Sequence, residues 1–158
     1  MILLVILVIL AYMALSHIID YRILKNYYLQ KQRWDLNICC GNTDGGGVNA
    51  DIVYRNVPNF VLTGIYNLPF KDKVFKNVLC SHTIEHVEDP ENFYEELRRV
   101  SENVTFLIPP LWDLMGILLF TEHKWLFLTF KSKHVNTLPK KIKLPYWWYH
   151  RKFGQRIK

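Results

Sequence analysis

The sequence predicts an α/β fold with a mostly parallel sheet, preceded by one helix that spans a membrane. Short apolar runs typical of strands recur between residues 36 and 108, and one amphipathic helical pattern lies among them. Strands interleaved with helices are typical of parallel sheets. Residues 1–19 contain no Asp, Glu, Lys or Arg, and the 158 residues of the chain are enough for one domain.

The amino terminus has the composition of a transmembrane anchor, which we assign to residues 1–19. Residues 2–10 are all aliphatic. Nineteen helical residues extend about 28 Å, which is close to the hydrocarbon thickness of a bilayer. A cleaved signal peptide and a buried core helix are the alternatives, but the segment lacks the basic start that is typical of signal peptides.

The charges that follow the anchor predict its orientation. We interpret residues 20–34 as a juxtamembrane helix or linker, with four Lys or Arg residues against one acidic residue. Basic residues next to a membrane span favour the cytoplasmic side. The rest of the chain is therefore expected in the cytoplasm. The three cysteines agree, because an odd number with two adjacent members is a poor disulfide framework.

The carboxyl-terminal region is strongly basic. From His123 to Lys158 there are ten Lys or Arg residues, no acidic residue, and many interleaved aromatic residues. This mixture suits a membrane surface, and it also suits RNA, on whose bases aromatic rings stack. The apolar anchor favours the membrane, so we do not expect nucleic acid as a partner.

The central region, residues 35–110, is expected to hold the sheet. Strands are predicted at 36–40, 48–53, 60–62, 74–80 and 105–108, and a helix at 90–101. The links after the first two strands are shorter than the dozen residues that a parallel crossover usually takes. The sequence therefore predicts either extended loops in place of helices or a different strand order. Residues 111–158 form a cap, whose apolar runs at 111–120 and 125–130 are either interfacial or ordinary core.

Residues 82–86, His-Thr-Ile-Glu-His, match a zinc-peptidase pattern. On a continuous helix the two histidines and Glu85 would share one face. However, Asp89 and Pro90 are a strong helix start only three residues later, so the segment is expected to be a turn. We therefore expect no metal site here.

Four motifs, in the right order, resemble class I S-adenosylmethionine-dependent methyltransferases of the type 11 group. Residues 36–41 resemble the first glycine motif, and residues 68–80 resemble the LPF stretch with the strand that follows it. Residues 81–87 resemble the SxxLEHV segment, and 95–100 resemble the ExxRV helix. The resemblance covers residues 34–110. It implies a compact Rossmann-like methyltransferase sheet, here with reduced helices.

The resemblance also implies S-adenosylmethionine as cofactor and a set of donor-binding residues. A glycine-rich turn lets the backbone approach the donor, and an acidic residue after the next strand holds the ribose hydroxyls. Gly41 with residues 45–47 would supply the turn, and Asp51 the carboxylate. The expected donor-binding residues are Cys40, Gly41, Asn42, Asp51, Gly64, Ile65, Ser81 and His82. The chain departs from the family at Asn37, Cys39, Gly64 and Lys76, where the usual residues are Asp, Gly, an acidic residue and Asp.

Three residues after the fourth strand are candidates for proton transfer: His82, Glu85 and His86. An imidazole beside the transferred methyl group can accept the proton of an acceptor hydroxyl. Structural roles in shaping the turn remain open for all three.

The predicted function is methyl transfer from S-adenosylmethionine to a membrane-associated small molecule. The acceptor class, a lipid, an isoprenoid or a lipid-linked headgroup, follows from the apolar anchor and the apolar, basic and aromatic cap, not from any pocket residue. The alternative is a non-catalytic binding or scaffold protein with the same fold, which the motif departures favour.

The charge distribution predicts a cytoplasmic carboxyl terminus. A reporter enzyme that is active only in the cytoplasm, fused after Lys158, is expected to be active. A reporter that requires export is expected to be inactive in the same fusion. The opposite pair of results would mean that the anchor is inverted or cleaved as a signal peptide.

Overall fold

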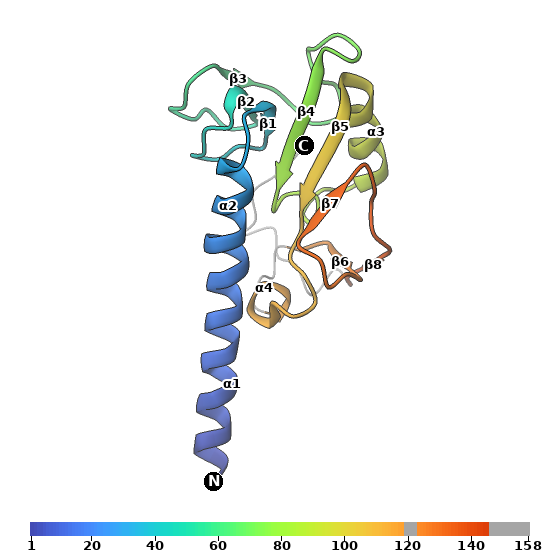
Figure 1. The fold of residues 1–158 in the computed structure, drawn as a ribbon. Helices are drawn as coiled ribbons and strands as arrows, with labels where there is room; N and C mark the ends of the chain where they lie inside the picture. Colours follow the sequence, from blue (N-terminus) through green and yellow to red (C-terminus); the bar gives the residue numbers. More distant parts are fainter. Residues whose placement is uncertain (119–122, 146–158) are drawn as a thin grey trace.

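A computed structural model of the chain describes residues 1–118 and 123–145, which form a six-stranded sheet, a long amino-terminal helix and a small two-stranded sheet (Figure 1). The end of the apolar run at 111–120 and the aromatic, basic tail after residue 145 lie outside the described residues.

The amino-terminal helix is continuous from Ile2 to Gln30. It consists of α1 (Ile2–His17), the π-helical segment η1 (Ile18–Leu24) and α2 (Lys25–Gln30). The helix is long and apolar enough to cross a membrane, by length and composition. Its first ten side chains are exposed. The segment expected as a juxtamembrane helix or linker is thus helical as far as residue 30.

Five parallel strands form most of the main sheet. They are β1 (Trp34–Ile38), β2 (Gly46–Asp51), β3 (Phe60–Leu62), β4 (Phe75–Ser81) and β5 (Ser101–Leu107). The order is β3-β2-β1-β4-β5, and β7 (Lys133–Val135) adds to β5 in the antiparallel direction. This is the Rossmann-like order, with its switch point between β1 and β4. The predicted α/β fold is confirmed.

Loops replace the helices that would follow β1 and β2. The links are residues 39–45 and 52–59, and neither contains a helix. Two buried amides hold the first loop, because Asn49 Oδ1 accepts from Gly45 N at 2.9 Å and Asn37 Nδ2 donates to Thr43 O at 3.0 Å. Of the two sequence alternatives, extended loops are therefore correct. Asn37, which departs from the family motif, stabilises this loop.

The helix α3 (Pro90–Val100) covers one face of the sheet. Asp89 caps it by accepting from Asn92 N, with Pro90 in the first turn. Phe93, Leu97 and Val100 are fully buried in the main core. The helix predicted at 90–101 is confirmed, because its cap and its apolar spacing are local signals.

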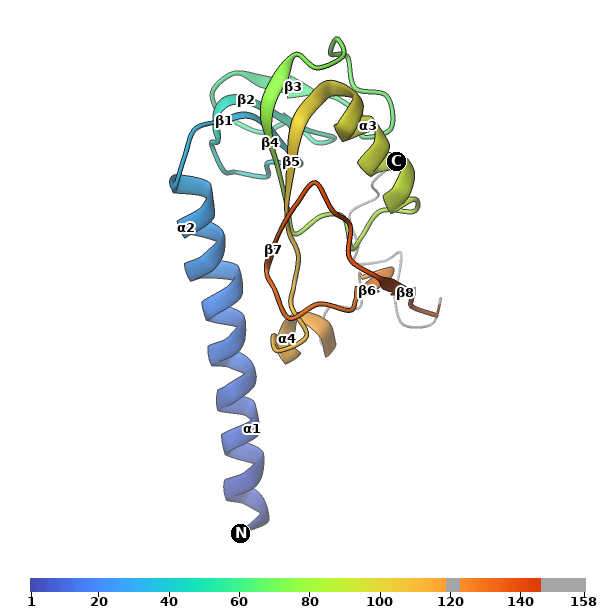
Figure 2. The same ribbon diagram turned by 45° about the vertical axis from the view of Figure 1, so that its right-hand side comes forward.

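The end of the amino-terminal helix packs on the sheet through Trp34. The indole Nε1 lies 3.3 Å from Tyr28 O and 3.2 Å from Leu29 O. Trp34 forms a second small cluster with Leu79 and Leu107. Trp34 is already part of β1, one residue before the expected start of the central region. Beyond this contact, α1 projects past the carboxyl ends of β4 and β5 (Figures 1 and 2).

The described part of the cap contains α4 (Leu114–Leu118), the strand β7 that joins the main sheet, and a small antiparallel pair, β6 (Trp125–Phe127) with β8 (Lys141–Lys143). Phe127 is buried in the main core, so the run at 125–130 contributes ordinary core. The segment before α4 contacts α1, because Tyr12 donates to Trp112 O at 3.0 Å and His17 Nδ1 lies 3.0 Å from Asp113 Oδ2.

Truncation of the α3 core face is expected to destabilise the domain strongly. Leu97→Ala removes a fully buried side chain and should lower the free energy of unfolding by about 2–5 kcal/mol. The matched exposed change on the same helix, Glu95→Ala, should cost less than about 0.5 kcal/mol. Urea unfolding of the detergent-solubilised protein measures both. Equal effects would mean that α3 does not pack as described.

Candidate active site

The carboxyl ends of β1, β2 and β4 bring most of the predicted site residues to one edge of the sheet. Cys40 and Gly41 follow β1, Asp51 ends β2, and Ser81 and His82 stand at the end of β4. Because β1 and β4 flank the switch point, this is where ligands bind in open α/β sheets.

Asp51 and Gly41 are in direct contact. The Asp51 carboxylate is nearly buried, and its Oδ2 accepts from Gly41 N at 2.9 Å. Its Oδ1 accepts from Val53 N at 3.0 Å, and Arg55 Nε lies 3.7 Å from Oδ2. Gly41 has φ +55°, and a Cβ there would meet no atom within 4 Å. The backbone at Gly41 is thus left-handed and open on the side of a missing side chain.

Residues 45–47 lie at the opposite edge of the sheet. Gly46 pairs with Trp34 at the start of both strands. A Cβ on Gly47 would lie 2.4 Å from Trp34 O, and one on Gly45 would lie 2.7 Å from Asn37 Cβ. The expectation that these glycines belong to the donor turn is wrong. They are required because the loop packs directly on β1.

Gly64, Ile65 and Asn42 are three further predicted site residues. Thr63 N donates to Asp51 O at 3.0 Å, which places the following Gly64 and Ile65 beside β2. Gly64 is exposed, whereas the Ile65 side chain is buried in the main core. Asn42 is also exposed. Of these three residues, only Gly64 and Asn42 are accessible to a ligand.

His82 is held in a left-handed turn, with φ +48°. Its ring lies between two carboxylates, with Nε2 3.9 Å from Asp20 Oδ2 and Nδ1 4.0 Å from Glu85 Oε1. Tyr21 meets the ring edge-on at 5.1 Å. Burial lowers the pKa of His82 to about 3, so the ring is neutral at physiological pH. Asp20 and Tyr21, both from η1, were not identified from the sequence as site residues.

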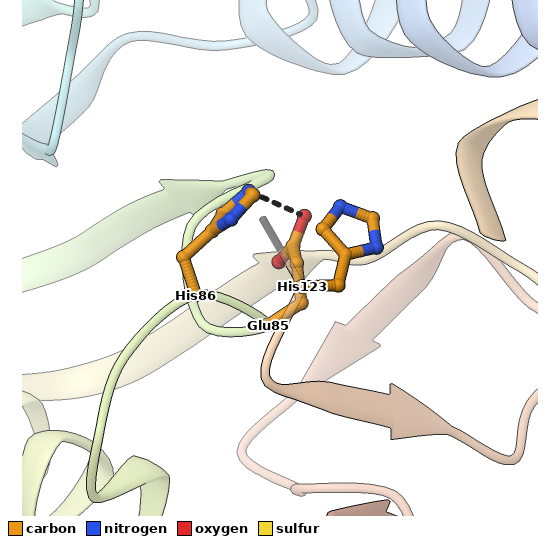
Figure 3. Close-up of side chains that lie close together, drawn as sticks. All are labelled: Glu85, His86 and His123. Carbon is orange, nitrogen blue, oxygen red and sulfur yellow. Dashed lines mark ion pairs between the residues drawn. The ribbon is translucent and has the colours of Figure 1, made fainter. Parts of the chain in front are cut away.

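Glu85 is a buried carboxylate, and among residues 1–118 and 123–145 neither of its oxygens has a hydrogen-bond partner. Burial raises its pKa to about 8. Its Oε1 lies 3.9 Å from His86 Nε2, and His123 lies on the other side (Figure 3). Burial lowers the pKa of His123 to about 2. His123 was missed by sequence reasoning because it lies far along the chain from Glu85 and shares no spacing pattern with it.

Cys39 lies near both Asp51 and Glu85, which belong to the two groups of site residues described above. Burial, and then the nearby Asp51, raise the pKa of its thiol, to which Glu85 also contributes. Cys39 is therefore a neutral thiol between the Asp51 side and the His82 turn. Nearby at the end of β4, Ser81 Oγ is buried without a hydrogen-bond partner. A ligand at this edge would supply one.

Residues 37–108 match the family model described as a methyltransferase domain. This match, over a little under half of the chain, supports an enzyme with a methyltransferase domain, and it is consistent with a class I methyltransferase of the type 11 group. The family implies S-adenosylmethionine as the methyl donor. The match covers every strand of the parallel sheet from the end of β1 to β5. No curated protein matches the chain significantly.

Three solved structures with related folds illustrate the range of sequence identity and coverage. A Pyrococcus horikoshii protein is 22% identical, with 76% of this chain and 73% of that chain covered and a TM-score of 0.47. A putative methyltransferase from an antibiotic biosynthesis pathway of Anabaena variabilis is 17% identical, with 59% and 47% covered and a TM-score of 0.42. A SAM-dependent methyltransferase from Aquifex aeolicus is 14% identical, with 57% and 65% covered and a TM-score of 0.41. The chain therefore spans less than two thirds of the latter two proteins.

The residues at the edge fit a methyl donor. Gly41 leaves the backbone open, Asp51 retains acceptor lone pairs beside its backbone bonds, and Ser81 Oγ lacks a partner. When bound, S-adenosylmethionine supplies an electrophilic methyl group on a sulfonium. Backbone and carboxylate groups would hold the donor here, since no crossover helix follows β1 to present its N-terminus.

Removal of the Asp51 carboxylate should weaken donor binding. Asp51→Ala is expected to lower the affinity for S-adenosylmethionine by about 1–3 kcal/mol, which is the usual cost of losing hydrogen bonds to a charged group. Isothermal titration of the solubilised protein measures this. Asp72→Asn, an exposed carboxylate in the turn before β4, is the matched control and should bind normally. Unchanged affinity in the Asp51 variant would remove this residue from the donor site.

Proposed function

We propose that the protein transfers a methyl group from S-adenosylmethionine to an oxygen or nitrogen atom of a small molecule held in a membrane, such as a lipid, an isoprenoid or a lipid-linked headgroup. The observation that carries this proposal is the position of the anchor helix. The η1 segment of that helix contacts the edge of the sheet where the donor residues lie, through Asp20 and Tyr21 at His82. The apolar α1 then projects beyond this edge (Figure 2).

The surroundings of α1 also support a membrane at this edge. Tyr12 of α1 bonds to Trp112, and Trp112 Nε1 donates to Phe130 O at 3.0 Å. The Phe130 side chain is 73% exposed. Tyr and Trp are enriched at the level of lipid headgroups. The aromatic residues around α1 therefore favour an interfacial position for this side of the domain.

The proposal includes a division of the chain. Residues 1–19 would serve as a single-pass anchor, 20–34 as the juxtamembrane segment, and 35–110 as the catalytic domain in the cytoplasm. Residues 111–158 would be the cap, whose described part contacts α1 through Trp112 and Asp113.

We assign proton acceptance to His82. Its neutral ring stands at the end of β4, beside the donor residues at the switch point. A hydroxyl oxygen that receives the methyl group would carry a strongly acidic proton. A buried imidazole with a low pKa is then basic enough to take it. Glu85 and His86 orient this turn, and Cys40, Gly41, Asn42, Asp51, Gly64, Ile65 and Ser81 complete the donor side.

Radiolabelled transfer tests the proposal. The purified protein in liposomes of total membrane lipid, given S-adenosylmethionine with a tritiated methyl group, is expected to label the lipid fraction. His82→Asn, in which Asn tolerates the left-handed turn, should lower the rate by a factor of about 10²–10⁴. Isothermal titration of the same variant with S-adenosylmethionine separates lost proton transfer from weakened donor binding, because His82 is also an expected donor-binding residue.

Two results would contradict the proposal. Label that appears only in water-soluble acceptors would exclude a membrane-held substrate while leaving the donor site intact. Donor binding without any transfer, from either lipid or soluble extracts, would instead favour the non-catalytic binding or scaffold protein.

A further inference from the structure

Glu85, His86 and His123 come together from two parts of the chain that are distant in sequence. Each offers one ligand atom, and these atoms all lie within 4.8 Å of one another. Figure 3 shows the side chains of Glu85, His86 and His123 close together, with the Glu85 carboxylate beside the two rings. The two rings are in edge-to-face contact, with centroids 4.7 Å apart.

The carboxylate at the centre of this cluster lacks hydrogen-bond donors. Glu85 is 2% exposed, and both of its oxygens are buried without a hydrogen-bond partner. A buried polar group without a partner is unfavourable, and native structures contain few of them. Two imidazole nitrogens beside a carboxylate form a ligand set that favours a transition metal over magnesium or calcium.

We propose that Glu85, His86 and His123 form a binding site for one divalent transition-metal ion of the zinc type. Zinc is bound by three protein ligands with a fourth position left for water or a substrate atom in many catalytic sites. In a tetrahedral site with bonds of about 2.1 Å, ligand atoms lie about 3.4 Å apart. The three ligand atoms, which lie within 4.8 Å of one another, would therefore need only to move closer by side-chain rotation.

The backbone around the cluster is already fixed. Glu85 O accepts from Lys124 N at 2.8 Å and from Trp125 N at 3.1 Å. In addition, Trp125 Nε1 donates to Val87 O at 2.9 Å. These bonds hold the segment that carries His123 against the turn that carries Glu85. The ligands are thus brought together by the fold, and binding the ion requires no rearrangement of the chain.

The expected absence of a metal at residues 82–86 rested on the lack of a third ligand and of a continuous helix. The structure supplies a third ligand, His123, from outside the pattern. His82 is not part of the cluster, so the zinc-peptidase spacing of the two histidines is irrelevant to it. The site uses Glu85 as a ligand, a role that this pattern does not assign to it.

Cobalt titration of the solubilised full chain tests this site, because tetrahedral Co²⁺ absorbs strongly in the visible range. The wild type, treated first with a chelator, is expected to bind one Co²⁺ and to release it to Zn²⁺. Glu85→Gln and His123→Asn should each weaken Co²⁺ binding tenfold or more. His134→Asn, in a half-buried histidine of β7 outside the cluster, is the matched control and should bind as the wild type does.

A third ligand variant separates metal binding from folding. His86 is partly exposed, so His86→Asn is expected to fold, as checked by circular dichroism and by S-adenosylmethionine binding. It should nevertheless lose Co²⁺ affinity tenfold or more. The ion should also raise the unfolding temperature of the wild type and not that of this variant. Absence of stoichiometric Co²⁺ and Zn²⁺ binding by the wild type, or equal binding by wild type and folded His86→Asn, would overturn the proposal. Neither result bears on methyl transfer.

Discussion

The packing of the amino-terminal helix against the sheet is the interaction on which the other features of this protein depend. Trp34 lies at the point of contact, with its indole bonded to the last turn of the helix and its ring packed with Leu79 and Leu107. A parallel sheet must be covered on both faces, because its strands are apolar on both sides. Here α3 covers one face, and the end of a helix that continues into the anchor helps to cover the other.

This arrangement explains how a methyltransferase sheet persists in so short a chain. The helices that would follow β1 and β2 are replaced by loops of seven and eight residues. Buried amides substitute for the missing apolar cover, since Asn37 and Asn49 bond to each other and to the first loop. As a consequence, the first loop packs directly on β1, so there is no room for a side chain at Gly45 or Gly47.

Local signals predicted most of the fold from the sequence. The cap and apolar spacing of α3 are contained within residues 89–100, and β3 is bounded by turn residues that define it closely. The position of Asp51 followed from its place at the end of the second strand. In contrast, the role of residues 45–47 was misjudged, because a glycine-rich loop looks the same in sequence at either edge of a sheet.

The parts of the site that were missed depend on contacts between distant segments. Asp20 approaches His82 only because η1 lies along the edge of the sheet, and His123 reaches Glu85 only because β6 docks on the turn. Neither residue has neighbours in sequence that indicate such a role. A charged residue directly after a long apolar run was the one available signal, and for Asp20 it suggested only the end of the anchor.

Under the proposed function, the length of α1 would set the height above the bilayer at which methyl transfer takes place. Its 16 residues rise about 24 Å, most of the thickness of a hydrocarbon layer. With α1 in the bilayer, Asp20 stands at the boundary between hydrocarbon and headgroups, and His82 stands 3.9 Å from it. An acceptor then needs no extraction into solution. Acceptors would be sorted by how far the reactive atom protrudes from the hydrocarbon, so depth in the bilayer becomes a form of substrate specificity.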